Sequence, residues 1–154
     1  MDAEIRRIKE EEFPEATALA WRVFLKYNAP GYTSDGVYNF RQFLTDEKLY
    51  ELFINGDYLM FACFVEGAPR GIISLRNGNH ISLLFVDENY HKMGIATSLL
   101  EYVCDCCRKK DDIDCLTVNS SPYAEDFYRH FGFLDTDQAK ITDGILYTPM
   151  KYIL

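Results

Sequence analysis

The sequence has 154 residues, of which 48 % are hydrophobic and 26 % are charged. This length and composition suit a single globular domain over 1–154 and argue against an intrinsically disordered chain. Acidic residues outnumber basic ones 24 to 16, giving a net charge of −8. This charge argues against a general nucleic-acid binder and against docking on an anionic membrane, because both rely on clustered Lys and Arg.

The chain shows no sign of a membrane span or an export signal. No apolar run approaches the ~20 residues that cross a bilayer, and residues 1–12 lack the apolar core of a signal peptide. The five cysteines are an odd number, and Cys104, Cys106 and Cys107 are crowded together. We therefore expect a cytoplasmic protein with reduced thiols. The cysteine spacing is not that of a zinc site, and no metal is expected.

The N-terminal part predicts a short strand and two helices. Glu4–Ile8 is the candidate strand. Pro14 suits the first turn of a helix, and apolar residues then recur at helical spacing as far as Tyr27. Residues 28–31 end this helix. Ser34 is the predicted N-cap of a second helix. The residues expected to face inward on it are Val37, Phe40, Phe43 and Leu44.

Three segments rich in aromatic and β-branched residues follow. They are Tyr58–Val65, Arg70–Leu75 and His80–Val86, and each is typical of a strand. Glu66-Gly67 and residues 77–79 separate them and have the composition of hairpin turns. The segments therefore predict an antiparallel meander.

The last third of the chain alternates helix and strand. The predicted elements are a helix over 94–108, a strand over 114–119, a helix from Ser121 to Gly132 and a strand over 145–153. Pro149 implies an edge or a bulge in the last strand. A meander that feeds a β-α-β crossover indicates an α/β (α+β) fold, with a mixed, mostly antiparallel central sheet and helices on both faces.

The most informative loop joins the strand that ends at Val86 to the helix that begins near Gly94. The free amides of the first helical turn and the helix dipole suit a phosphate or pyrophosphate. Gly94 and Ala96 keep side chains small where a ligand would approach. The loop is neither a P-loop nor a dinucleotide fingerprint. The alternative is an ordinary strand–loop–helix corner, in which Gly94 only permits close packing.

Two segments resemble motifs of the GNAT acyltransferase superfamily. His91-Lys-Met-Gly-Ile-Ala96 is similar to the pyrophosphate loop Gln/Arg-x-x-Gly-x-Gly/Ala, and residues 84–86 resemble the strand that contacts acetyl-CoA. Residues 117–124 and 127–133 are similar to a later motif that contains Asn, then Ala, then Phe-Tyr-x-x-x-Gly-Phe. Two motifs in the right order are more specific than either alone. His91 departs from the pattern, since Gln or Arg is usual there, and this leaves its contact to the pyrophosphate open.

The resemblance implies transfer of the acetyl group of acetyl-CoA to a primary amine of a small molecule or peptide, by direct attack in a ternary complex. A backbone amide of the splayed strand, at Phe85 or Val86, is expected to stabilise the oxyanion. Asn119 is expected to bond the pantetheine amides. The expected acetyl-CoA-binding residues are Phe85, Val86, His91, Lys92, Met93, Gly94, Ala96, Thr97 and Asn119.

Two side chains are candidates for catalysis. The resemblance places Tyr128 beside the CoA sulfur as the proton donor to the leaving thiolate; the alternative is one more core aromatic. His80 is the candidate general base, since imidazole has a pKa near ~6.5. Strand alternation predicts that His80 and Ser82 share a face with Leu84. The alternative is a polar residue beside a turn, with a water chain deprotonating the acceptor.

The rival interpretations are a non-catalytic acyl-CoA-binding or sensory domain and a protein-interaction domain. The first would keep the loop but need neither Tyr128 nor a base. The acceptor site is expected to be shaped by residues 21–43 and the C-terminal hairpin, which no motif describes. A homodimer is expected only because dimers are common.

Overall fold

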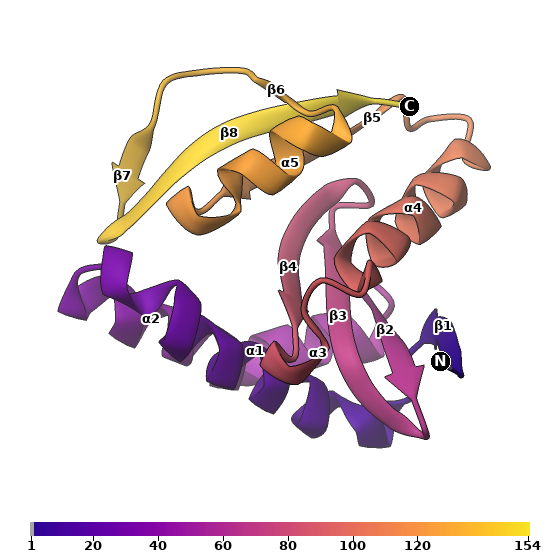
Figure 1. The fold of residues 1–154 in the computed structure, drawn as a ribbon. Coiled ribbons are helices and arrows are strands. Elements are labelled where there is room, and N and C mark those ends of the chain that lie inside the picture. The colour runs from indigo at the N-terminus through magenta and orange to yellow at the C-terminus, as the bar shows by residue number, and fades with distance from the viewer. Residues whose placement is uncertain (1) are drawn as a thin grey trace.

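The computed structural model describes residues 2–154, whose strands form a mixed sheet with helices against both faces (Figure 1). The strands are β1 (Ala3–Arg7), β2 (Tyr58–Val65), β3 (Ala68–Arg76), β4 (His80–Val86), β5 (Cys115–Ser120), β6 (Leu134–Asp135), β7 (Lys140–Thr142) and β8 (Ile145–Ile153). The helices are α1 (Phe13–Tyr27), α2 (Ser34–Thr45), α3 (Glu47–Ile54), α4 (Ile95–Arg108) and α5 (Glu125–Phe131), with short 3-10 turns η1 (Glu10–Glu12), η2 (Ala29–Gly31), η3 (Glu88–Tyr90) and η4 (Pro122–Ala124).

The strand order is β1-β2-β3-β4-β5-β8-β6, and β7 pairs with β8 outside this path. Within residues 2–154 every strand pair is antiparallel except β4 with β5. The crossover through α4 joins these two parallel strands, because a parallel pair needs a long connection. This arrangement confirms the predicted fold class, including the meander of β2, β3 and β4.

One local expectation is corrected, and three short elements were not expected. The N-cap of α2 is Thr33, whose side chain accepts a hydrogen bond from the Gly36 amide at 3.0 Å, and not Ser34. One of the unexpected elements is α3, a short helix capped by Asp46 that buries only Leu49 and Phe53. The others are β6 and β7, which are too short to carry a strand pattern.

Pro149 lies inside β8, between the residues paired with β6 and those paired with β7. Its carbonyl oxygen accepts a hydrogen bond from the Thr136 amide, on the side of β8 away from β5. The nitrogen and carbonyl of one strand residue point the same way, so the missing N–H falls on this interrupted side. The proline therefore removes no hydrogen bond between β8 and β5.

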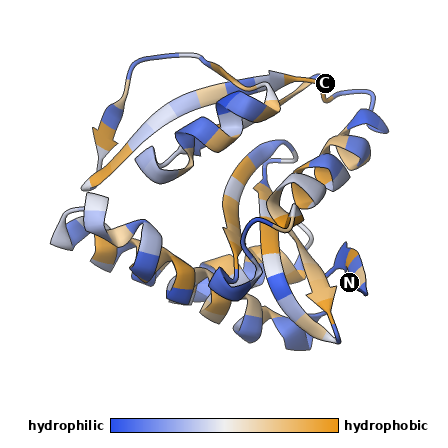
Figure 2. Cartoon of the chain, viewed as in Figure 1, coloured by the Kyte–Doolittle hydropathy of each residue, from blue (hydrophilic) through white to orange (hydrophobic). Residues whose placement is uncertain are grey.

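The sheet has a hydrophobic core on each face. Helices α4 and α5 cover one face, where Leu99 and Val103 pack with Ile73. Helices α1 and α3 cover the other, where Leu19 packs with Ile72. Figure 2 shows β4 as largely hydrophobic and the helices as two-sided. No helix within residues 2–154 is both long and apolar enough to cross a membrane.

The close approach of α4 to β3 fixes where α4 begins. A Cβ added at Gly71 would lie only 2.6 Å from Cγ2 of Ile95, the first residue of α4. Gly71 therefore lets the first turn of α4 lie directly on the sheet. Because Gly71 pairs with Val86, this turn lies beside the end of β4. The sheet in this way positions the free amides of the helix start.

Candidate functional site

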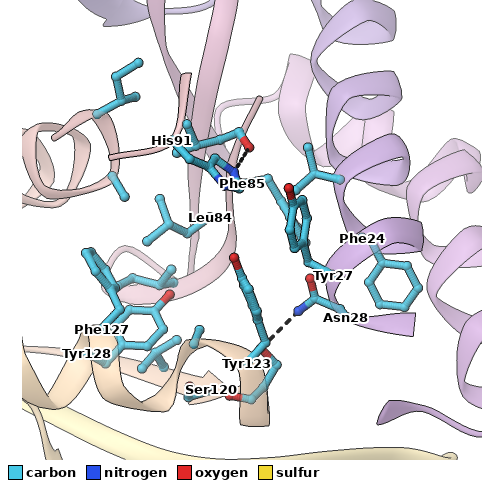
Figure 3. Close-up of a pocket in the computed structure, with 18 of the residues that line it drawn as sticks. Phe24, Tyr27, Asn28, Leu84, Phe85, His91, Ser120, Tyr123, Phe127 and Tyr128 are labelled. Carbon is cyan, nitrogen blue, oxygen red and sulfur yellow. Dashed lines mark hydrogen bonds between the residues drawn. The ribbon is translucent and has the colours of Figure 1, made fainter. Parts of the chain in front are cut away.

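The cavity at this site lies where β4 and β5 separate. The two strands pair only through His80 with Thr117 and Ile81 with Val118, and they diverge beyond these residues. The space between them is a cavity of ≈ 510 Å³. Figure 3 shows it bounded by α1 on one side and by α5 on the other, with β4 between them. A strand edge without a partner leaves backbone groups free to bind a ligand.

A bulge in β4 accompanies this separation. Ser74 of β3 faces Leu83, but the next residue, Leu75, faces Ile81, so Ser82 has no partner on β3. The buried side chain of Tyr58, which is 1 % exposed, stabilises the bulge. The Tyr58 hydroxyl donates to Ser82 Oγ at 2.9 Å and lies 2.7 Å from Ser74 Oγ.

The bulge overturns the predicted alternation along β4. Ile81 and Leu84 pack against the core under α4, whereas Leu83 belongs to the core under α1. His80 precedes Ile81 and so points to the face opposite Leu84. The expectation that His80 and Ser82 share a face with Leu84 is therefore wrong, because Ser82 adds one residue and reverses the phase.

The start of α4 opens onto the cavity. Gly94 is its N-cap, with φ of 79°, and no side chain caps the helix. The amides of Ile95, Ala96 and Thr97 therefore have no partner within the helix, and all three residues line the cavity. A Cβ added at Gly94 would meet nothing within 4 Å. The packing explanation for Gly94 is thus wrong: glycine is favoured there by the left-handed backbone, and the space beside it is open.

His91 ties the loop to β4. Its Nε2 lies 2.8 Å from the carbonyl oxygen of Val86, and since a carbonyl can only accept, Nε2 carries the proton and donates. The His91 ring also packs 5.0 Å from the ring of Tyr27. The imidazole therefore holds the loop against the strand end and against α1.

The hydrogen bonds at the end of β4 show which amides face the cavity. The Asp87 amide donates to the Arg70 carbonyl of β3 at 2.8 Å, while the Val86 carbonyl points the other way, to His91. Because successive residues of a strand point to alternate sides, the amides of Val86 and Leu84 face the cavity and that of Phe85 faces β3. Of the two amides expected to hold an oxyanion, the geometry favours Val86.

Tyr128 closes the cavity from α5. Its side chain is 4 % exposed and packs edge-on against Phe127 and Phe133, at 5.4 and 5.2 Å between ring centroids. Figure 3 shows its hydroxyl directed toward the cavity. Burial raises the pKa of Tyr128 far above its ordinary value. The phenol keeps its proton at neutral pH, which a proton donor needs but which holds for any tyrosine.

The geometry agrees with what comparisons with known proteins find. Residues 28–154 match the family model described as an acetyltransferase (GNAT) domain. The chain belongs to the GNAT acetyltransferase family. Among curated proteins no sequence match is found.

Several solved structures share the whole fold. A GCN5-related N-acetyltransferase from Rhodopseudomonas palustris superposes with a TM-score of 0.85 at 20 % identity, covering 100 % of this chain and 97 % of the other. PaiA N-acetyltransferase from Thermoplasma acidophilum, in complex with coenzyme A, gives 0.79 at 21 % identity and covers 100 % of both chains. Apo YjaB from Escherichia coli gives 0.73 at 21 %, covering 99 % of this chain and 97 % of the other.

Most of the predicted site residues meet in the cavity of this GNAT domain. Those that line it are Phe85, Val86, His91, Lys92, Gly94, Ala96, Thr97, Asn119 and Tyr128. Met93 is 54 % exposed and lies outside the lining, because the tight turn at Lys92 and Gly94 directs it to the surface. His80 also lies outside, at the start of β4, where the two strands are still paired.

The surroundings of His80 hold its imidazole neutral. Its Nδ1 hydrogen-bonds Thr117 Oγ1 at 2.8 Å. Burial, and then the positive charge of Arg76, lower the pKa of His80 to about 4. An imidazole with this pKa is a weak proton acceptor. Its position and its pKa therefore both fit the structural interpretation of His80 better than the catalytic one.

Residues 21–43 were expected beside the acceptor, but the contacts of α1 with η4 were not. Asn28 Nδ2 donates to Ser121 Oγ at 3.0 Å, and the rings of Tyr27 and Tyr123 lie 5.3 Å apart. These two contacts join the end of α1 to the start of η4 across the diverging strands (Figure 3). Residues so distant in sequence carry no common motif, so only the fold brings them together.

A stability measurement tests the environment of His80. The folded pKa of about 4 lies below the ordinary 6.5, so the unfolded chain binds more protons between these values. The contribution of His80 to the free energy of unfolding is therefore fully present above pH 6.5 and is lost as the pH falls toward 4. We expect His80 to account for about 1–2 kcal/mol of destabilisation between pH 7 and pH 5.

The matched variant is His80→Gln, which keeps a polar side chain but does not titrate. Urea unfolding at both pH values should give a smaller pH-dependent loss for the variant than for the wild type. Equal losses in the two proteins would show that His80 titrates normally, and its catalytic interpretation would regain support.

Proposed function

We propose that the protein transfers the acetyl group of acetyl-CoA to the primary amine of a small molecule or peptide, by direct attack in a ternary complex. One observation carries the proposal: the free amides at the start of α4, the unpaired edge of β4 and the phenol of Tyr128 all face one cavity. The match to the acetyltransferase (GNAT) model supports the same chemistry.

The cavity fits the two polar parts of acetyl-CoA. The amides of Ile95, Ala96 and Thr97 would bind the pyrophosphate, with the dipole of α4 adding partial positive charge. Gly94 leaves that approach open. Asn119, exposed at the end of β5, would hydrogen-bond the amides of the pantetheine arm. The unpaired backbone groups of β4 would bind the same arm. The bound cosubstrate supplies an acetyl thioester.

The chain's own groups then serve the transfer. As the amine nitrogen bonds to the carbonyl carbon and the carbon–sulfur bond breaks, the Val86 amide donates to the carbonyl oxygen where negative charge develops. Tyr128 donates its proton to the departing sulfur and recovers one from the acceptor through water. Because His80 does not line the cavity, we assign deprotonation of the acceptor to water. The products are the acetylated amine and the CoA thiol, which together account for all atoms of the neutral amine and acetyl-CoA.

The experiment measures release of CoA thiol from acetyl-CoA in the presence of a panel of primary amines, beside a thermal unfolding assay. We expect acetyl-CoA to raise the melting temperature, since a ligand at 100 times its Kd stabilises the fold by ~2.7 kcal/mol. We expect thiol release that depends on an amine. Stabilisation without thiol release for any amine would favour a non-catalytic acyl-CoA-binding domain. An equal rise in melting temperature with NADH or ATP would contradict the assignment of acetyl-CoA as the cosubstrate.

A further inference from the structure

The side of the cavity formed by α1 has an aromatic wall. Six rings from α1, η4, β4 and the α2 region line it: Phe24, Tyr27, Tyr32, Phe40, Phe85 and Tyr123. Residues 21–43 supply four of them, which is the region where we expected the acceptor. This wall lies across the cavity from Tyr128 (Figure 3).

The rings are ordered by contacts with one another. Phe24 stacks on Phe40 with centroids 4.1 Å apart and meets Tyr32 edge-on at 5.0 Å. Phe40 in turn lies 6.0 Å from Phe85 of β4. Phe24 is buried, but Tyr32, Phe40 and Phe85 are only half-buried, so part of their surface is left to the cavity. The wall therefore presents flat apolar surface to whatever approaches the edge of β4.

This wall carries no counter-charge for a cation. None of the 24 acidic residues, all within the described part of the chain, lines the cavity. Asp87, directly after β4, is buried and paired with Arg22 at 3.2 Å and Arg70 at 3.5 Å, and Glu88 is paired with Lys26.

Glu125, which directly follows the lining residue Ala124, is also occupied. Oε1 of Glu125 accepts a hydrogen bond from Thr148 at 2.9 Å, and Oε2 lies 3.5 Å from Arg129. Among residues 2–154, Lys92 is the only Lys, Arg, Asp or Glu in the lining. A second ammonium group on an acceptor would thus leave water without finding a carboxylate, which is unfavourable.

From this lining we infer that the acceptor is a primary amine carried on an aromatic ring system and bearing no second positive charge. The inference rests on the proposed acetyl transfer. The ring stacks among Tyr32, Phe40 and Phe85, and the single amine reaches the edge of β4, where it loses its proton through water before it attacks. Diamines and polyamines are poor acceptors, although the net charge of −8 would attract them.

The test compares kcat/KM for 2-phenylethylamine, hexylamine and 1,4-diaminobutane by thiol release. We expect 2-phenylethylamine to exceed the diamine at least tenfold and to exceed hexylamine. A diamine as good as the aromatic amine would overturn the inference and leave the acetyl transfer standing. Turnover of other amines with none of 2-phenylethylamine would overturn it too. If no amine releases thiol, the proposed function fails, and the inference fails with it.

A pair of variants locates the specificity in the wall. Tyr32→Glu places a carboxylate in the lining and should raise the diamine's kcat/KM, relative to that of 2-phenylethylamine, at least tenfold. Tyr38→Glu adds the same charge on α2 at a side chain that is 61 % exposed and outside the cavity, so its ratio should equal that of the wild type. Equal shifts in both variants would show a long-range charge effect and contradict the assigned wall. The wild-type comparison decides the inference even where Tyr32→Glu does not fold.

Discussion

Gly94→Glu should abolish the stabilisation of the protein by acetyl-CoA. The glutamate carboxylate would stand beside the free amides of α4, where steric overlap and like charge both oppose a pyrophosphate. At a concentration of 100 times the wild-type Kd, the ~2.7 kcal/mol of stabilisation should fall below ~0.5 kcal/mol, which requires at least a hundredfold loss of affinity. The measurement is the melting temperature with and without acetyl-CoA.

The matched control is Gly67→Glu in the turn between β2 and β3. Gly67 has φ of 82° against 79° for Gly94, and an added Cβ meets nothing within 4 Å at either position. Both variants therefore carry the same charge change and a similar backbone strain of ~1–2 kcal/mol. Without acetyl-CoA the two should melt at similar temperatures, and only Gly67→Glu should respond to it. A full response of Gly94→Glu would refute the assigned pyrophosphate loop.

Tyr128→Phe should slow the acetyl-transfer step at least tenfold while leaving acetyl-CoA affinity and melting temperature almost unchanged. The phenol acts as the carbon–sulfur bond breaks, so its loss raises the barrier and not the ground-state binding energy. General-acid assistance is worth roughly 10²–10⁴-fold. Since product release can limit turnover, single-turnover rates are the quantity to compare.

Tyr102→Phe is the control, because it removes a tyrosine hydroxyl from α4, outside the cavity, where the ring packs 5.3 Å from Phe61. Its rate should equal that of the wild type. If the ring of Tyr128 alone mattered, Tyr128→Phe would be tolerated and only Tyr128→Ala would be harmful, through a loss of about 3–5 kcal/mol of core packing. A normal single-turnover rate for Tyr128→Phe would therefore remove Tyr128 from the mechanism.

The parts of the site that depend on short stretches of sequence could be predicted. The loop from Val86 to Gly94 needs only a strand end, a glycine and a helix start, all of which are local signals. The motif around Tyr128 likewise lies within one helix and its C-cap at Gly132. These features, together with the meander, were enough for the fold class.

The features that were missed depend on contacts between distant segments. The bulge at Ser82 is held by Tyr58 and Ser74, which belong to two other strands, so alternation read along β4 alone assigned His80 to the wrong face. The contact of Asn28 with Ser121 spans most of the domain. Neither arrangement leaves a periodic pattern in the sequence.

The most direct test of the account is a grid of initial rates in which the concentrations of acetyl-CoA and of a good amine acceptor are both varied. Direct attack between β4 and β5 requires both substrates in the cavity at once, because no nucleophile of the chain is assigned to carry the acetyl group. Reciprocal plots should therefore give intersecting lines. Parallel lines, as a covalent acetyl-protein produces, would contradict transfer in a ternary complex.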